Sequence, residues 1–385
     1  MRLFSRIICS STRRDIGSRQ KGWSAQTKRM PLEVRRPGRM RRAVYDVVLR
    51  VTLAVASVAI LCAVGELVCR VFLPDTQLRY VSDPEALFRL APNQVATQAI
   101  GLAAPPARIN RLGLRGADPD TTRPRILILG DSFTFGSGVG DDETFAARLD
   151  HWLGGTVSVI NGGQPGYGIY QQVATLRRVG QDLRPRLVIV VIWQGDFLRQ
   201  PPDAAERERF FRRQRLSQIV KTSVLASHLY RRLERLLIKA GQDSLVFNVG
   251  EGGRRAEVDP QAILDAHLNG MRADWPRLLV MHEEARRYGI GLLLVLWPKE
   301  DFAGLPKAER GLAERLTVAL AARARQDSIP FVSVQGAMRR ISSKYRLVIP
   351  NDGHPTPLAH CLAAELIGQK LTDVGFALVQ SERCV

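Results

Sequence analysis

A serine and a histidine lie far apart in the chain, in two segments whose residue types suit nucleophilic chemistry. In the first, residues 125–136, an apolar run of strand length ends at Gly130 and is followed by Asp131 and Ser132. A buried strand that ends in this way places the serine hydroxyl at the carboxyl edge of a sheet, where α/β proteins bind ligands. Backbone N–H groups of the following turn could hold an oxyanion. Taken alone, the segment also fits a plain strand–turn junction in which Ser132 caps a helix.

The second segment lies near the C-terminus, where Asp352 precedes His354 by two residues on a loop rich in glycine and proline. Hydrolysis by a serine nucleophile needs an imidazole that takes the hydroxyl proton and a carboxylate that holds the imidazole in the right tautomer. The two-residue spacing on an irregular loop lets both side chains face one pocket. Taken alone, the segment is better explained by Asp352 as a helix cap and His354 as a surface residue.

Together the two segments resemble the SGNH (GDSL-like) hydrolase family. Gly130-Asp131-Ser132 matches its first block, which implies that Ser132 is the nucleophile. Asp352-x-His354 matches its last block, which implies that His354 is the base and Asp352 the orienting acid. Several ordered blocks make the resemblance far more specific than one motif.

Two further blocks carry the resemblance, which extends over residues 109–371. Residues 161–168 are similar to the second block, and Gly166 matches the glycine whose N–H, with that of Ser132, is implied to form the oxyanion hole. Residues 110–116 are similar to the N-x-x-G-[FL]-R-G lead-in of membrane-anchored members.

The third block departs from the family pattern. It should end in Asn-Asp, with the asparagine amide donating to the oxyanion, but here Gln194 is followed by Gly195 where the asparagine belongs. Loss of one such donor costs about 10²–10³ in turnover in a well-studied protease. Three explanations stay open: Gln194 supplies the amide, backbone N–H groups suffice, or catalysis is weak. Neighbours on a strand point to opposite faces, which counts against Gln194 unless the strand has already ended.

Apolar runs of strand length alternate with helical patterns, which predicts a parallel sheet with helices on both faces. This agrees with the flavodoxin-like three-layer α/β/α sandwich and five-stranded parallel sheet that the resemblance implies, preceded here by one transmembrane helix. The predicted strands are 125–129, 157–160, 187–193, 291–297 and 329–334, and the main predicted helices are 144–153, 170–180, 265–287, 308–325 and 358–371.

The net charge of +19 over 385 residues is concentrated at the N-terminus. Residues 1–42 hold thirteen Lys or Arg against two acidic residues. Residues 1–43 are therefore predicted to be a basic, disordered cytoplasmic tail. No aromatic-and-basic RNA motif or recognition-helix pattern accompanies the charge, so we predict no nucleic-acid function.

Residues 44–73 are predicted to be a single membrane anchor. The uncharged stretch 51–65 is short for a spanning helix, which needs about 20 apolar residues, so the span must include its flanks. A cleaved signal peptide is the main alternative, and a buried core helix is disfavoured behind so basic a tail. Arginines before the span keep the N-terminus in the cytoplasm and place the remaining chain on the outer side of the cytoplasmic membrane.

The rest of the chain divides into an extracytoplasmic stem, 74–123, and a hydrolase-like domain, 124–380. Residues 201–257 interrupt the alternation as a helical insertion. The plainer interpretation is a lid or side-packing helix pair with a solvated face. The alternative is a binding site for an acidic polymer or membrane headgroups.

No metal ligand set is recognisable, and the implied chemistry needs no cofactor. His360, six residues after His354, is interpreted as structural rather than as a second base. Cys361 and Cys384 would lie in an oxidising space and could pair, although spacing does not fix their distance.

The sequence therefore predicts a membrane-anchored serine esterase that acts on acyl or acetyl esters of a carbohydrate or lipid. One alternative keeps Ser132, His354 and Asp352 but transfers the acyl group to a cell-surface polysaccharide, with a membrane partner protein as acyl donor. The other is a non-catalytic carbohydrate-binding relative, which the intact residue set argues against. Substrate identity is not readable, because specificity lies in loops.

Overall fold

The structure is a computed structural model that describes residues 37–72, 77–97, 105–220, 222–239, 260–297, 307–350, 352–376 and 384. Most of the predicted basic tail lies outside these residues. The chain divides into two compact units, 1–61 and 62–385, and the second contains the folded domain.

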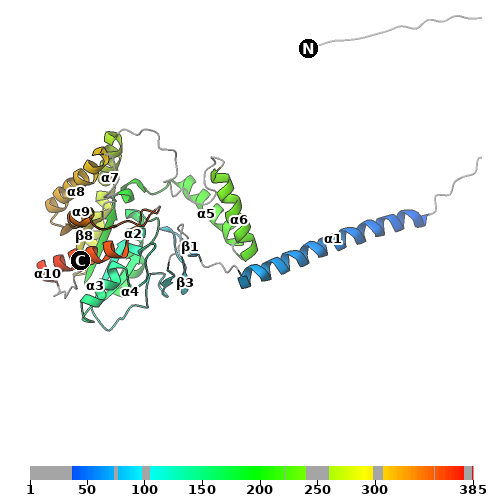
Figure 1. Ribbon diagram of the computed structural model, residues 1–385, viewed down its shortest axis with the longest axis horizontal. Helices are drawn as coiled ribbons and strands as arrows, with labels where there is room; N and C mark the ends of the chain where they lie inside the picture. The colour runs from blue at the N-terminus through cyan, green and yellow to red at the C-terminus, as the bar shows by residue number, and fades with distance from the viewer. Residues whose placement is uncertain are drawn as a thin grey trace, which may run out of the picture. The chain divides into compact units, whose positions relative to one another are not determined.

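A five-stranded parallel sheet in the order β6-β5-β7-β8-β9 forms the centre of this domain (Figure 1). Its strands are β5 (Arg125–Gly130), β6 (Ser158–Gly163), β7 (Leu187–Trp193), β8 (Gly291–Trp297) and β9 (Phe331–Ser333). The prediction of a five-stranded parallel sheet is confirmed. All seven residues of β7 are buried, because a central strand of a parallel sheet is covered on both faces.

Helices cover both faces of the sheet and complete the predicted three layers. Ile126 and Ile128 pack on one side and Leu127 and Leu129 on the other, as the two-residue period of a strand requires. The first side is covered by α3 (Phe145–Trp152), α9 (Gln335–Ile341) and α10 (Pro357–Asp373), and the second by α4 (Ile169–Leu183), α7 (Pro260–Arg287) and α8 (Lys307–Gln326).

The segment expected to be a stem contains four short strands in two antiparallel pairs. The pairs are β1 (Tyr80–Asp83) with β2 (Leu87–Leu90), and β3 (Gln94–Ala96) with β4 (Ala107–Ile109). Leu90 and Ile109 pack against Phe135, close to the loop that follows β5. Phe88 contacts Tyr167 edge to face at 5.4 Å between ring centroids. These residues therefore form part of the domain's packing.

Three further helices lie outside the sandwich. The first, α1 (Pro37–Phe72), contains a stretch, Arg41–Phe72, that is long and apolar enough to cross a membrane by length and composition. In the predicted insertion, α5 (Ala204–Val220) and α6 (Val224–Lys239) contact each other (Figure 1). The remainder of the insertion, 240–257, lies outside the described residues.

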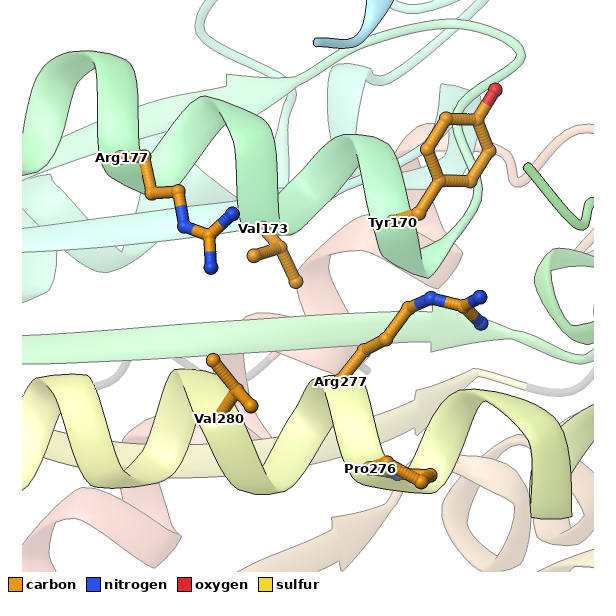
Figure 2. A pocket seen from close by; sticks show the side chains of 6 residues that line it. All are labelled: Tyr170, Val173, Arg177, Pro276, Arg277 and Val280. Carbon is orange, nitrogen blue, oxygen red and sulfur yellow. The ribbon is translucent and has the colours of Figure 1, made fainter. Parts of the chain in front are cut away.

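A surface hollow of about 280 Å³ lies between α4 and α7 (Figure 2). Its wall is mainly apolar, and its two cations are already paired, Arg177 with Glu284 and Arg277 with Asp274. The lining residues are Tyr170, Val173, Arg177, Pro276, Arg277 and Val280. None of them is a predicted catalytic residue, so this hollow is separate from the candidate site.

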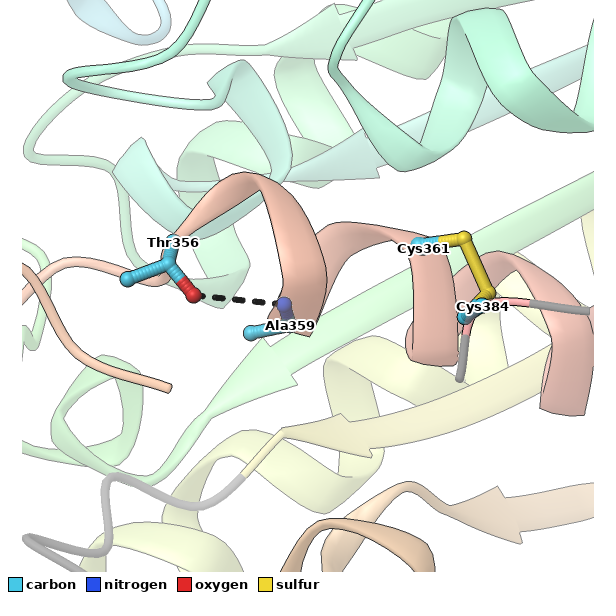
Figure 3. Close-up of a disulfide and its surroundings, with 4 residues drawn as sticks. All are labelled: Thr356, Ala359, Cys361 and Cys384. Atoms are coloured by element: carbon cyan, nitrogen blue, oxygen red, sulfur yellow. Dashed lines mark hydrogen bonds between the residues drawn. A yellow bond between two sulfur atoms is a disulfide. The ribbon is translucent and has the colours of Figure 1, made fainter. Parts of the chain in front are cut away.

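A disulfide joins Cys361, in the second turn of α10, to Cys384 (Figure 3). The Thr356 hydroxyl caps the same helix by accepting a hydrogen bond from the Ala359 N–H at 3.4 Å (Figure 3). Pro357 follows at the first helical position, where its fixed φ and missing N–H cost nothing. The helix that follows the predicted catalytic histidine is thus fixed at its start and clamped in its second turn.

Cys384→Ser should lower the free energy of unfolding by about 3 kcal/mol, because the bond closes a loop with a sequence separation of 23. Denaturant unfolding of the detergent-solubilised chain, with and without reductant, measures this change. Cys62→Ser is the control, because Cys62 is a free, exposed cysteine. Equal stability of the two variants would show that the disulfide does not constrain the chain.

Candidate active site

Ser132 lies directly beyond the carboxyl end of β5 and begins the one-turn helix α2 (Ser132–Phe135). The neighbours of β5 are β6 on one side and β7 on the other, and such a reversal of strand order creates the ligand crevice of open α/β sheets. The Asp131 side chain caps α2 by accepting from the Phe133 N–H at 2.9 Å. Gly136, in the left-handed region with φ of 82°, ends the helix. The serine is therefore held at the sheet edge on a tight strand–helix turn.

The glycines around this turn allow α2 to pack directly on the backbone of β6. A Cβ atom on Gly163 would lie 2.2 Å from the Phe135 backbone nitrogen, which is too close for any side chain. Asn161 adds polar contacts, since its Nδ2 donates to Thr134 O at 2.9 Å and its Oδ1 accepts from the Gly163 N–H at 3.0 Å. The Asn-Gly-Gly sequence of the second block thus helps to hold the strand–helix turn that carries Ser132, which we call the serine turn.

The structure brings His354 and Asp352 to Ser132 from a point 222 residues further along the chain. The distance from Ser132 Oγ to His354 Nε2 is 2.9 Å, and that from His354 Nδ1 to Asp352 Oδ1 is 2.6 Å. Ser132 is buried, and the His354 side chain is 18% exposed. The site is thus enclosed but still open to solvent at the imidazole.

A tight loop holds the acid and the histidine together. Gly353 between them has φ of 88°, which suits glycine, and the Ile349 N–H donates to His354 O at 2.8 Å. Because the carboxylate of Asp352 can only accept, it favours the tautomer with the proton on Nδ1 and leaves the Nε2 lone pair facing the serine hydroxyl. This geometry lets the imidazole take the hydroxyl proton.

Two backbone N–H groups are candidates for the oxyanion hole. Gly166 has φ of 85°, and its loop is fixed by the buried Gln164, which donates to Gly113 O at 2.8 Å and accepts from the Leu90 N–H at 2.9 Å. Within the described part of the chain, the N–H groups of Ser132 and Gly166 have no protein acceptor. Both remain open to a substrate oxygen.

The structure gives a physical reason for Gly195. Strand β7 ends at Trp193, and a 3₁₀ turn, η1 (Gln194–Leu198), follows. A Cβ atom on Gly195 would lie 2.0 Å from the Trp193 indole, which stacks on Phe133 at 5.7 Å. The indole therefore fills the space that an asparagine side chain would need. The Oε1 atom of Gln194 is buried without a partner among the described residues, so no contact assigns its amide to the hole.

Arg199, which the sequence did not point to, joins the loops that follow β5, β6 and β7. Its Nη1 donates to Asp196 Oδ1 at 2.8 Å, to Tyr167 O at 2.9 Å and to Asp131 Oδ2 at 3.3 Å. The guanidinium also lies over the Trp193 ring at 4.9 Å. Burial, together with the neighbouring Asp131 carboxylate, raises the pKa of Asp196 well above its ordinary value. The Arg199 guanidinium opposes this rise in the pKa, because it places a positive charge beside the carboxylates of Asp131 and Asp196.

Arg115 has a role that its motif did not reveal. Its side chain, 2% exposed, donates to the carbonyls of Phe135 and Gly136 at 2.6 Å and of Val139 at 2.7 Å, and it pairs with Asp141 at 2.8 Å. The residue therefore holds the whole turn after Ser132. The signal in the sequence was the lead-in block 110–116, but side-chain bonds to backbone carbonyls cannot be read from residue types.

His360 does not join the site. It lies in the core, stacked on Phe145 at 6.0 Å and edge-on to Trp297 at 5.3 Å. Burial lowers its pKa to about 3, which keeps the ring neutral. In the part of the chain that the structure describes, no group of three or more His, Cys, Asp or Glu residues is arranged to hold a metal ion.

Comparison with known proteins identifies related sequences and folds. The model of the GDSL-like lipase/acylhydrolase family matches residues 128–362, more than half of the chain. No curated protein matches the chain.

Solved structures that match include a catalytic mutant of an acetylxylan esterase from Geobacillus stearothermophilus, with 16% identity, a TM-score of 0.38, and 67% of this chain and 97% of that chain covered. A GDSL-like lipase from Bacteroides thetaiotaomicron matches with 16% identity, a TM-score of 0.33, and 67% and 93% covered. At these identities and TM-scores, the structures say nothing about the substrate of this chain.

Gly195→Asn should destabilise the protein by about 1–3 kcal/mol, because the new side chain must displace the Trp193 indole from its stack. Denaturant unfolding and ester turnover are measured together. Gly336→Ala in α9 is the control, because a Cβ atom there meets no atom within 4 Å. A Gly195→Asn variant with unchanged stability and raised kcat would mean that an amide fits and that the hole had lacked a donor.

Arg115→Lys should lower kcat by about 10²-fold with little change in KM. The three donors of an ammonium sit on one nitrogen and cannot reach the three carbonyls and Asp141 together, and a displacement near 1 Å has effects of that size. Steady-state kinetics on a short-chain nitrophenyl ester separates the two constants. Arg111→Lys should change neither constant, since Arg111 is exposed and its ion pair with Asp118 is long, at 3.9 Å. A proportional rise in KM would instead indicate damage to substrate binding.

Proposed function

The chain belongs to the GDSL-like lipase/acylhydrolase family, a family of ester-bond hydrolases, and from this premise we propose that it is a serine esterase with Ser132 as nucleophile. The observation that carries the proposal is the hydrogen-bonded series from Ser132 through His354 to Asp352, at 2.9 and 2.6 Å. Each member has the chemical type that its place in the series needs.

In the proposed mechanism, His354 Nε2 takes the Ser132 proton while Oγ attacks the ester carbonyl. The carbonyl oxygen becomes an oxyanion that accepts hydrogen bonds from the N–H groups of Ser132 and Gly166. The imidazolium, oriented by Asp352, returns the proton to the leaving alkoxide, and an acyl-enzyme remains. A water molecule, deprotonated by His354, then attacks the acyl carbonyl. The imidazolium returns this proton to Ser132 Oγ as the carbon–oxygen bond breaks, which releases the acid and regenerates the free serine.

We propose further that the substrate is an acyl or acetyl ester on a carbohydrate or lipid at the outer face of the cytoplasmic membrane. The stretch Arg41–Phe72 has the length and composition of a membrane span. Basic residues before it favour a cytoplasmic N-terminus. The Cys361–Cys384 disulfide supports an oxidising location for the domain. An anchored enzyme on that side meets esters of the cell surface.

Ser132→Ala should abolish both ester hydrolysis and labelling by a fluorophosphonate, because the acyl-enzyme cannot form. Asp352→Asn should lower kcat by about 10⁴, the effect of removing an orienting carboxylate in serine proteases. Mass spectrometry of the labelled full chain maps the modified residue, and Ser342→Ala is the control. Undiminished turnover in Ser132→Ala would reject the proposal.

An acyl-enzyme that discharges onto an added oligosaccharide but not onto water would favour the acyltransferase alternative, with a membrane partner as donor.

A phosphatase fused after Val385 should be active, and a fluorescent protein that folds only in the cytoplasm should stay dark at the same position. The N-terminal sequence of the purified chain is determined in parallel. The reverse reporter pattern would contradict the outward-facing domain, and a mature chain that starts at Glu66 would replace the anchor with a cleaved signal.

A further inference from the structure

Helix α6 carries a row of exposed leucines. Leu229, Leu233 and Leu236 are 61%, 51% and 60% exposed, whereas most leucines of the sheet and its covering helices are buried. Their spacing of four and three residues places them within about 60° of one another around the helix axis. These three residues, which we call the leucine row, form one continuous apolar strip on a solvent-facing side of α6.

The sequence of α6 also carries a net positive charge. Its sequence contains Arg231, Arg232, Arg235 and Lys239 against one acidic residue, Glu234. A helix with an apolar strip and an excess of cationic residues has the composition of helices that lie in the interface of anionic membranes. At about 1.5 Å per residue its 16 residues are too short to cross the hydrocarbon core.

The start of α6 is bound to the carboxyl-terminal part of α1, the candidate membrane span. The Glu66 carboxylate accepts hydrogen bonds from Ser223 Oγ at 2.7 Å, from the Val224 N–H at 3.0 Å and from the Leu225 N–H at 2.9 Å. A carboxylate there satisfies unpaired N–H groups and suits the helix dipole. A Cβ atom on Gly65 would lie 3.1 Å from Leu225, so the two helices also pack closely here.

We propose that α6 is a second membrane contact that lies in the headgroup region of the bilayer that α1 enters. The leucine row faces the acyl chains, and the exposed Arg232 meets anionic headgroups. The proposal rests on the membrane anchoring proposed above. A lipid surface is the favoured partner because the start of α6 is bound to Glu66, which lies within two turns of the end of the span at Phe72. The net positive charge of the α6 sequence also favours an anionic lipid surface.

The proposed contact between α6 and the membrane would limit which esters can enter the candidate active site. Helix α5, which contacts α6, also contacts the β1–β2 hairpin. Ser82 Oγ donates a hydrogen bond to Oε1 of Gln214 in α5 at 2.7 Å, and the ring of Phe210 in α5 lies 6.0 Å from that of Phe88 between centroids. Phe88 in turn packs on Tyr167, the neighbour of Gly166. Two anchored helices therefore fix the orientation of the domain, and the accessible esters are those at the lipid surface.

The test uses the full chain in nanodiscs of phosphatidylcholine with about one third phosphatidylglycerol. Cys9, Cys62 and Cys69 are replaced by alanine, and an environment-sensitive fluorophore is attached at Leu233→Cys or, as the matched control, at Val318→Cys on α8, which is 64% exposed. Lipids with a quencher in the upper acyl chain should reduce emission at position 233 at least ~2-fold more than at 318, since such helices sit about 5–10 Å into the boundary. Adding Leu229→Gln and Leu236→Gln should remove the difference, whereas Val280→Gln and Val374→Gln should not.

Three outcomes would overturn the inference. Equal quenching at 233 and 318 would place α6 in water. A water-shielded label at 233 that lipid quenchers do not reach would mean that protein, a second copy or a membrane partner, covers the leucine row. A chain that leaves the nanodisc would reject the membrane anchor and α6 docking together. Fluorophosphonate labelling of Ser132 in the same samples reports on the esterase separately, so its failure would reject the proposed function alone.

Discussion

The geometry of the serine turn depends on the hydrogen bonds that the buried guanidinium of Arg115 donates. An unpaired cation in the interior costs several kcal/mol, so the chain around it must supply acceptors in fixed positions. Three of these are backbone carbonyls of the turn that follows α2, and the fourth is Asp141. The Arg115 N–H also donates to Asn161 O at 3.1 Å. One residue thus ties the region before the sheet to the serine turn and to β6.

The remaining parts of the site are fixed by other means. Loops after β5, β6 and β7 meet at the carboxyl edge of the sheet, and Arg199 joins them through Asp131, Tyr167 O and Asp196. Asp352 and His354 come from the other end of the chain and lie on a loop that leads into the capped, disulfide-linked α10. Ser132 and His354 are therefore held by separate rigid elements, which fix the 2.9 Å distance between Oγ and Nε2 without a direct covalent link.

Structural features that burial imposes on residue types could be predicted from the sequence. The five sheet strands were visible as apolar runs, most completely in β7 and β8, because central strands covered on both faces are almost entirely apolar. Strands β1–β4 were missed because runs of three or four residues with mixed polarity carry no clear period. The roles of Arg115 and Arg199 depend on backbone carbonyls and on residues up to 68 positions apart, which no local pattern encodes. The motif residues were predictable as candidates, whereas their distances required the fold.

Gly195 illustrates how a local departure from a family pattern acquires a physical meaning in the fold. In the sequence it was a missing amide donor; in the structure it is the position that lets Trp193 stack between Phe133 and Arg199. If backbone N–H groups alone hold the oxyanion, turnover should be lower than in relatives with the asparagine, by up to about 10²–10³. A domain held at a surface by α1 and α6 would meet surface-bound esters at a high effective concentration, which offsets a slow chemical step by favouring repeated encounters. Helix α6 is connected to the loop of Gly166 through α5, Phe88 and Tyr167. The contacts that would restrict substrate choice therefore also support the loop whose N–H group is a candidate donor to the oxyanion.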